Sequence, residues 1–231
     1  MRAALQYASW LLGLPLELLI ISALVRGAYR RFPVLLAYSL VVFLTTIADI
    51  SVYQAYYSGI KVAHTFAYYY WINEALRQSL VFAVVISLIY EATAVAKTRT
   101  LLRTCLVCGA IVFAGVSFLI HYDVHSVPGK WMTLWSRDID FSTAILDLAL
   151  WAILLTWRHK DMQLLLLSGG IGIEFTGEAI GQSLRSLFPG AVNAGNAVIL
   201  LANLAGMWVW WQALRPVREQ QPASVRSAKV R

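Results

Sequence analysis

Apolar residues dominate seven long stretches of the chain, which are separated by short polar segments. Within each stretch the apolar residues follow one another instead of alternating with polar ones, which is typical of helices and not of a membrane β-barrel. A helix needs about 20 apolar residues to cross the hydrocarbon core of a bilayer, and each stretch is close to that length. The pattern predicts an all-α integral membrane protein, a bundle of seven transmembrane helices over residues 4–25, 33–57, 66–91, 101–120, 138–157, 162–184 and 192–214.

The composition agrees with a single membrane-embedded domain. Hydrophobic residues make up 59% of the 231 residues and charged residues 13%, which is about half the charged fraction of an ordinary soluble domain. The seven stretches use most of the chain, so little remains for a separate soluble domain. We expect a transmembrane domain over residues 1–215 and a basic, disordered cytoplasmic tail over residues 216–231.

Basic residues outside the stretches predict the orientation in the membrane. Thirteen of the nineteen lysines and arginines fall on one side of the expected bundle, five fall on the other, and Arg77 lies inside a stretch. Cytoplasmic loops carry the excess of Lys and Arg. We therefore expect the N-terminus outside and the C-terminus in the cytoplasm, in a bacterial-type plasma (inner) membrane. Trp208, Trp210 and Trp211 are expected to form an aromatic belt at the cytoplasmic interface.

Several functions are excluded by what the stretches lack. The formal net charge is +7, but the basic residues lie in the connections and the tail, so we expect no nucleic-acid partner. None of the five lysines lies inside a stretch, so a retinal Schiff base has no anchor. All four histidines fall near the membrane surfaces, so no haem held by two histidines is expected inside the bundle.

Ionisable residues nevertheless occur inside the stretches. Such groups are costly in a bilayer, so they face the interior of a bundle or water and mark functional sites. We therefore predict that they bind a ligand or a proton, together with one asparagine of the seventh stretch. These candidates are Glu17, Asp49, Glu74, Arg77, Asp147, Glu174, Glu178 and Asn196.

Helical spacing places the polar residues on one face of each helix. Glu174 and Glu178 are four residues apart, and Asn193, Asn196 and Asn203 follow at i, i+3 and i+10. By helical rise, the acidic groups lie about 9 to 20 Å below the outer surface. The inner halves of the helices carry almost no charge. The sequence therefore predicts an outward-facing acidic cavity that apolar residues close from below.

Two other interpretations remain open. Polar residues can simply hold membrane helices together, and Gly177 and Gly181 form a small-xxx-small pair that suits close helix packing. Arg77 could anchor a carboxylate or phosphate of a ligand, or it could pair with Glu74, Glu174 or Glu178, and we favour the pairing. Six buried carboxylates against one arginine are too many for ion pairing alone, which favours a cavity over packing contacts.

A separate group of residues offers ligands for a metal ion. His121, Asp123 and His125 follow the fourth stretch as His-x-Asp-x-His, and imidazole and carboxylate ligands suit zinc or another divalent metal. In an extended loop the three side chains would share one side. We predict no other cofactor.

These observations favour a multi-pass transporter or ligand-sensing protein whose cavity takes a cation, a proton or a small polar molecule. One alternative is a membrane-embedded metal-dependent hydrolase that uses the His-x-Asp-x-His segment. Another is a structural subunit of a larger membrane complex. The expected partners are the lipid bilayer, a small polar ligand or cation, and a second copy of the chain or another membrane subunit. Because a fold alone does not specify a function, these possibilities stay open at this level.

Overall fold

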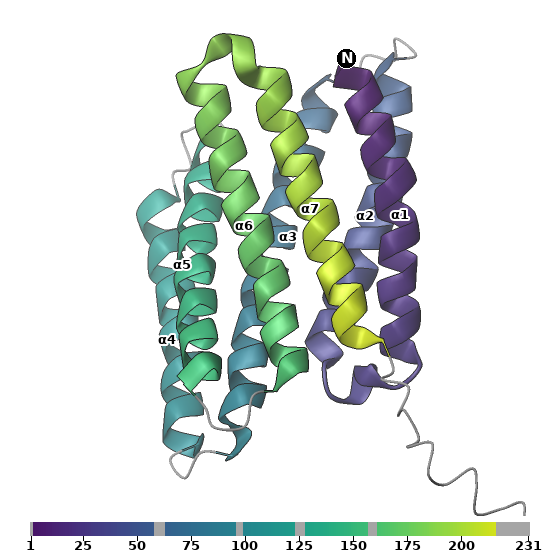
Figure 1. The fold of residues 1–231 in the computed structure, drawn as a ribbon. Coiled ribbons are helices and arrows are strands. Elements are labelled where there is room, and N and C mark those ends of the chain that lie inside the picture. The colour runs from purple at the N-terminus through teal and green to yellow at the C-terminus, as the bar shows by residue number, and fades with distance from the viewer. Residues whose placement is uncertain (1, 58–62, 96–98, 123–127, 157–160, 216–231) are drawn as a thin grey trace, which may run out of the picture.

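The computed structural model describes residues 2–57, 63–95, 99–122, 128–156 and 161–215. These residues form seven α-helices that run alternately up and down (Figure 1). Three short 3-10 segments also occur among the described residues: η1 (Ala28–Arg30), η2 (Thr93–Val95) and η3 (Pro189–Ala191). The helices are α1 (Arg2–Val25), α2 (Pro33–Tyr57), α3 (Ala63–Ala92), α4 (Arg99–His121), α5 (Pro128–Thr156), α6 (Met162–Leu187) and α7 (Val192–Leu214).

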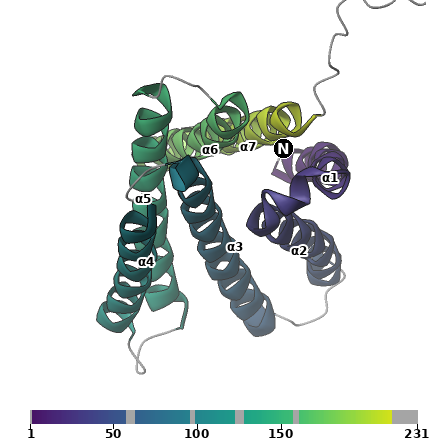
Figure 2. The same ribbon diagram turned by 90° about the horizontal axis from the view of Figure 1, so that it is seen from below.

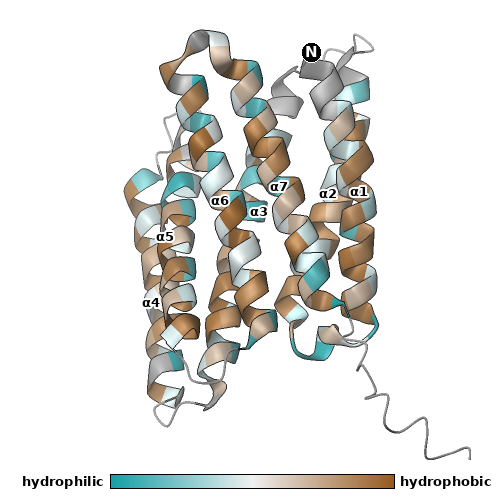
Figure 3. Cartoon of the chain, viewed as in Figure 1, coloured by the Kyte–Doolittle hydropathy of each residue, from teal (hydrophilic) through white to brown (hydrophobic). Residues whose placement is uncertain are grey.

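All seven helices are long and apolar enough to cross a membrane, with a mean hydropathy between 1.3 and 2.1 over their apolar parts. Figure 3 shows hydrophobic residues along most of their length. An all-helical bundle with seven such helices fits a multi-pass membrane protein, as the sequence predicted. The expected tail, residues 216–231, lies outside the described residues.

The helix bounds agree with the predicted stretches except in α5. Both α2 and α7 begin and end at the predicted residues. However, α5 begins at Pro128, whereas the sequence placed the start of this helix at residue 138. Its apolar part begins at Leu134, so hydropathy alone misses the polar first turns. Proline is favoured at the first position of a helix, where its missing N–H costs nothing, and this explains the earlier start.

The helices pack in an order that the sequence alone does not give. We call the end of the bundle at which α1 begins the N-terminal face, and the opposite end, at which α7 ends, the C-terminal face. α6 packs along α7, α7 along α1, α1 along α2 and α2 along α3. α5 packs against α3 and α6, and α4 lies at the periphery against α5 (Figure 2).

Glycines allow α6 and α7 to approach each other closely. A methyl group added at Gly181 would lie 2.7 Å from the carbonyl oxygen of Gly195, and one added at Gly195 would lie 2.6 Å from that of Gly181. One added at Gly177 would overlap the side chain of Ala202. The small-residue pair that the sequence singled out therefore lies in this helix–helix contact.

A hydrophobic core fills the half of the bundle next to the C-terminal face. Leu24, Leu88 and Leu154 are each at most 1% exposed. Trp210 belongs to this core and is 4% exposed, so its predicted place in an interfacial belt is wrong. Trp208, two residues earlier, is 48% exposed and faces outward as a belt residue does.

Arg31 connects three segments at the C-terminal face. Its Nε donates to Glu91 Oε1 at 2.7 Å on α3, and its Nη2 donates to Asp161 Oδ2 at 2.6 Å at the start of α6. Nη1 donates to Gln163 at 3.0 Å. Partial burial by itself raises the pKa of Asp161. The hydrogen bonds from Arg31 and from the backbone N–H of Leu164 outweigh that effect and hold the pKa below its usual value.

We expect the stabilising effect of Arg31 to depend on pH. Because the pKa of Asp161 is lowered in the folded state, its contribution is complete above the usual carboxyl pKa and disappears as the pH falls through the lowered value. Arg31→Gln should lower the free energy of unfolding at pH 7 by up to about 1 kcal/mol, because these groups are partly exposed. The difference between wild type and variant, measured by thermal unfolding, should shrink between about pH 5 and pH 2. Arg30→Gln is the matched control, because Arg30 forms no ion pair with a described residue and its hydrogen bond and ring contact are with the neighbouring Tyr29. An equal loss in both variants would contradict the prediction.

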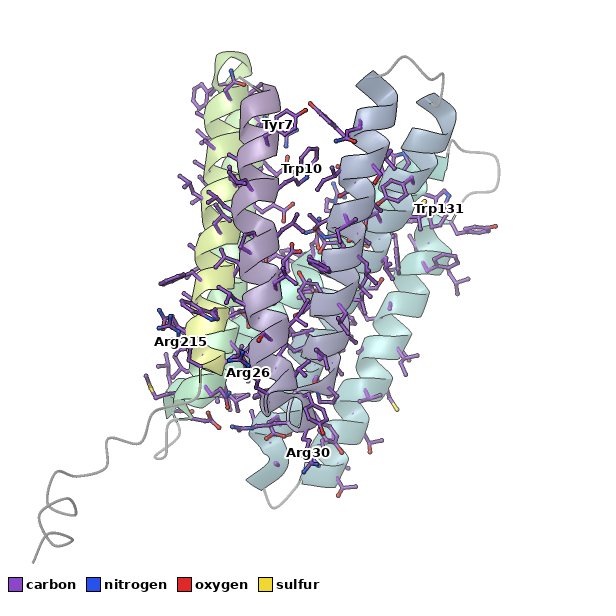
Figure 4. All side chains as sticks on the ribbon, turned by 90° about the vertical axis from the view of Figure 1, so that its right-hand side faces the viewer. Tyr7, Trp10, Arg26, Arg30, Trp131 and Arg215 are labelled. Atoms are coloured by element: carbon purple, nitrogen blue, oxygen red, sulfur yellow. The ribbon has the colours of Figure 1, made fainter. Side chains whose placement is uncertain are left out.

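Six labelled side chains show which residues lie toward each face of the bundle. Arg26, Arg30 and Arg215 lie toward the C-terminal face, and Tyr7, Trp10 and Trp131 lie toward the N-terminal face (Figure 4). By the excess of basic residues, the C-terminal face is expected to be cytoplasmic.

Labelling of single cysteines tests this orientation. The native Cys105 and Cys108 are exposed on α4 and are first replaced by alanine. Lys61→Cys and Lys130→Cys should then react in intact cells with a thiol reagent that does not cross membranes, and Lys160→Cys should react only after lysis. Labelling of Lys160→Cys in intact cells would show that the orientation is the opposite of the expected one.

Candidate functional site

A cavity of about 490 Å³ lies between α1, α2, α3, α6 and α7. It extends from Arg185, which is exposed near the end of α6, to Tyr38, which is 5% exposed beside the hydrophobic core. The cavity therefore occupies the half of the bundle next to the N-terminal face, and the core closes it below. The polar side chains on its wall are Ser9, Glu17, Tyr38, Thr46, Asp49, Glu74, Arg77, Gln78, Glu174, Glu178, Arg185, Asn196 and Asn203.

The structure brings seven of the eight candidate binding residues from the sequence to this one cavity. They come from five helices and from sequence positions that are far apart. The seven are Glu17, Asp49, Glu74, Arg77, Glu174, Glu178 and Asn196.

The eighth candidate, Asp147, lies elsewhere. Its side chain is 4% exposed and faces α6, where its Oδ1 accepts a hydrogen bond from Ser168 Oγ at 2.7 Å. Asp147 therefore links α5 to α6 behind the cavity, which corrects its grouping with the other acidic residues. The sequence could not show this, because a polar stripe on α5 does not say which neighbouring helix it faces.

Glu17 is the one acidic residue of α1, and it lines both the cavity and its deepest part. Thr46 of α2 donates a hydrogen bond to its Oε1 at 3.3 Å. Its Oε2 is buried and has no hydrogen-bond partner in the part of the chain that the structure describes. The side chain is 6% exposed and lines the cavity. A buried carboxyl oxygen without a donor is costly, so a proton on the carboxyl group or a donor group of a ligand would stabilise it.

The acidic residues of α3 and α6 face each other across the cavity. Glu74 accepts a hydrogen bond from Gln78 at 3.2 Å on its own helix, and its charge acts on Glu178. Glu174 accepts from Asn203 Nδ2 of α7 at 3.1 Å. These acidic groups thus retain oxygens for additional donors, because a carboxylate has room for about four hydrogen bonds.

Arg77 lies in the middle of this group of acidic residues. The charges of Glu174, Glu74 and Asp49 all act on it. Yet none of the described carboxylates lies within 4.0 Å of its guanidinium nitrogens. The direct ion pair that the sequence favoured for Arg77 is therefore absent among the described residues, and the guanidinium group lines the cavity instead.

A small side pocket continues from the cavity toward the core. Its volume is about 30 Å³, which is enough for one water molecule or a group of that size. Glu17, Arg77 and Glu174 line both spaces, and the core residues Tyr38 and Trp210 form part of the wall of the side pocket.

Of the aromatic residues of the wall, Trp10 and Tyr38 were missed at the level of the sequence although helical spacing contained the signal. Trp10 precedes Glu17 by seven residues, and Tyr38 precedes Asp49 by eleven. Both spacings correspond to whole helical turns, so each aromatic residue shares a face with an acidic one. An aromatic residue in an apolar run looks like a packing residue, which is why neither was proposed.

The metal hypothesis remains largely untested. His121 ends α4, and its Nε2 lies 2.9 Å from Asp138 Oδ2, which also accepts from Ser117 at 2.8 Å. Asp123 and His125 lie outside the described residues. Among the residues that the structure describes, no group of three histidine, cysteine or acidic side chains is placed to hold a metal ion.

Comparison with known proteins adds no further constraint. No protein-family model matches the chain, and no significant similarity to a curated protein or a solved structure is found. The function must therefore be inferred from the cavity itself, whose wall carries five carboxyl groups and two guanidinium groups.

Proposed function

We propose that the protein binds a small positively charged or polar molecule in this cavity, as a transporter or ligand-sensing protein of the plasma membrane. The N-terminal face is the outer one, so the ligand enters from outside. Glu17, Glu174 and Glu178 supply negative charge, and the polar residues in the deep half of the cavity orient the ligand.

One observation carries this proposal: five carboxyl groups from four helices meet at one cavity. Two arginines offset part of that charge, so three acidic groups remain without a basic counterpart on the wall. Burying such a surplus in a membrane requires a proton or a bound cation. The volume of about 490 Å³ lies within the range of small-molecule sites.

Helix packing alone does not account for these acidic residues. The closest contact in the bundle, between α6 and α7, is made by glycine and alanine. Asp147 and Ser168 illustrate what a polar packing contact looks like, because the two side chains bond directly between α5 and α6 and line no cavity. The acidic residues of the cavity face open space instead.

Ligand binding to the purified protein tests the proposal. Na⁺, Ca²⁺, putrescine and L-lysine serve as probes, and at least one should raise the melting temperature progressively as its concentration increases. Glu178→Gln removes one negative charge of the cavity and should weaken that binding about tenfold or more, since hydrogen bonds to charged groups contribute about 1.5 to 3 kcal/mol.

Asp147→Asn is the matched control. It makes the same chemical change at a buried acidic residue outside the cavity and should leave the affinity within about twofold of wild type. The proposal is wrong if no probe stabilises the wild type, or if both substitutions weaken binding equally. Uptake of the bound probe into proteoliposomes then separates transport from sensing.

A further inference from the structure

The side pocket and Arg77 together suggest the chemical class of the ligand. The wall is acidic overall, but its deepest part contains two opposite recognition groups side by side. Arg77 offers guanidinium donors, and Glu17 and Glu174 offer carboxyl oxygens. All three line both the cavity and the side pocket, so a single small molecule can reach them together.

Arg77 has the donors to bind a carboxylate. A guanidinium group has five N–H donors and binds a carboxylate through two parallel hydrogen bonds. In the described part of the chain, no acidic side chain lies within 4.0 Å of Arg77 to occupy those donors. Arg77 hydrogen-bonds to the side chain of Tyr38, which occupies one of its five N–H donors. The charges of the surrounding acidic groups stabilise the guanidinium charge.

The side pocket has the size and the acceptors to bind an ammonium group. Its volume of about 30 Å³ accommodates one group of about the size of water. Glu17 contributes a buried oxygen that has no partner among the described residues. Glu174, which is already held by Asn203 through one oxygen, lies on the same wall.

We propose that the ligand is a small zwitterion of the amino-acid class. Its carboxylate binds Arg77 and its ammonium group enters the side pocket between Glu17 and Glu174. This inference rests on the proposed function and narrows it. A ligand that is only an anion would meet five acidic groups, and a ligand that is only a cation would leave Arg77 without a carboxylate partner among the described residues. Because three acidic groups of the wall remain in excess, an amino acid with a neutral or basic side chain fits and one with an acidic side chain does not.

Pairs of probes that differ by one carboxylate test this inference. Glycine is compared with methylamine, L-alanine with ethylamine, and L-lysine with cadaverine, each by its dissociation constant for the purified protein. For at least one pair, the amino acid should bind wild type about tenfold or more tightly than its amine. Arg77→Gln should remove that preference, whereas Arg77→Lys should keep part of it because the positive charge remains.

Two further substitutions complete the test: one probes the ammonium end of the ligand, and the other is a control. Glu17→Gln should weaken the amino acid and its amine by the same factor, because both present an ammonium group. Arg185→Gln is the control at the rim of the cavity and should leave the preference for the amino acid unchanged. A melting temperature without ligand is measured for each variant, so that a folding defect is separated from a binding defect.

The outcomes distinguish this inference from the proposed function. If the amines bind as tightly as the amino acids, or if Arg77→Gln keeps the preference, the site is a simple cation site: the zwitterion is excluded, and the proposed function stands. The zwitterion assignment to Arg77 also fails if Arg185→Gln abolishes the preference. If none of the amino acids, amines or inorganic cations binds, both proposals are wrong.

Discussion

Gly181→Ala is expected to destabilise the bundle by about 1 to 3 kcal/mol, the usual cost of overpacking a well-packed contact. The added methyl group would lie 2.7 Å from the Gly195 carbonyl oxygen, which is backbone and cannot move aside as a flexible side chain does. α6 and α7 must then separate, and the hydrogen bond between Glu174 and Asn203 lengthens with them. Gly177→Ala should behave alike, because its methyl group would overlap Ala202. Thermal unfolding in detergent measures the effect.

Two glycines of α4 provide matched controls for these substitutions. A methyl group added at Gly109 or Gly115 meets no atom within 4 Å. Because alanine has a higher helix propensity than glycine by about 1 kcal/mol, Gly109→Ala and Gly115→Ala should keep or slightly raise the stability. If substitutions in α4 and in α6 have the same effect, the close contact between α6 and α7 does not determine the stability of the bundle.

The sequence predicted the helices well because the bilayer imposes their length and their apolar character. Residues 33–57 and 192–214 form helices with the predicted bounds, since their polar flanks coincide with the helix ends. The start of α5 was missed because Pro128 to Thr133 is helical without being apolar enough for the membrane criterion. Hydropathy reports the apolar part of a helix, and hydrogen bonding determines where the helix begins.

Much of the candidate site was also predictable, for a physical reason. A carboxyl group inside an apolar helix is too costly to face lipid, so Glu17, Asp49 and Glu174 had to point inward. Helical spacing gives the face of each helix but not the helix that it meets. Asp147 therefore could not be separated from the others until the packing of α5 against α6 was known. That no described carboxylate lies within 4.0 Å of the Arg77 guanidinium group depends on distances between helices, which no sequence pattern contains.

The same limitation explains the error at Trp210. Near the end of an apolar helix a tryptophan is usually interfacial, and Trp208 fits that rule. Trp210 lies 200° farther around the helix, which turns about 100° per residue, and so points into the bundle. There it packs edge-on against Tyr38 with ring centroids 5.7 Å apart, and its Nε1 donates to the Leu167 carbonyl at 2.9 Å.

Trp210→Ala should therefore be among the most damaging single substitutions in the chain. It removes a large buried ring and leaves the Leu167 carbonyl without its indole donor, which together should cost about 3 kcal/mol or more. Trp208→Ala deletes the same side chain from a position that is 48% exposed and should cost far less. Trp210→Phe keeps most of the ring and isolates the hydrogen bond, at about 1 kcal/mol.

The substitution should also affect the cavity, because Trp210 is a core residue that lines the side pocket together with Glu17 and Glu174. Truncation enlarges the side pocket, so the ammonium group of a ligand is held less closely against Glu17 and Glu174. We expect weaker binding of L-lysine in Trp210→Ala than in Trp210→Phe, measured at a temperature at which both variants are folded. If Trp210→Ala and Trp208→Ala are equally stable, the buried ring of Trp210 does not stabilise the core below the cavity, and this prediction is wrong.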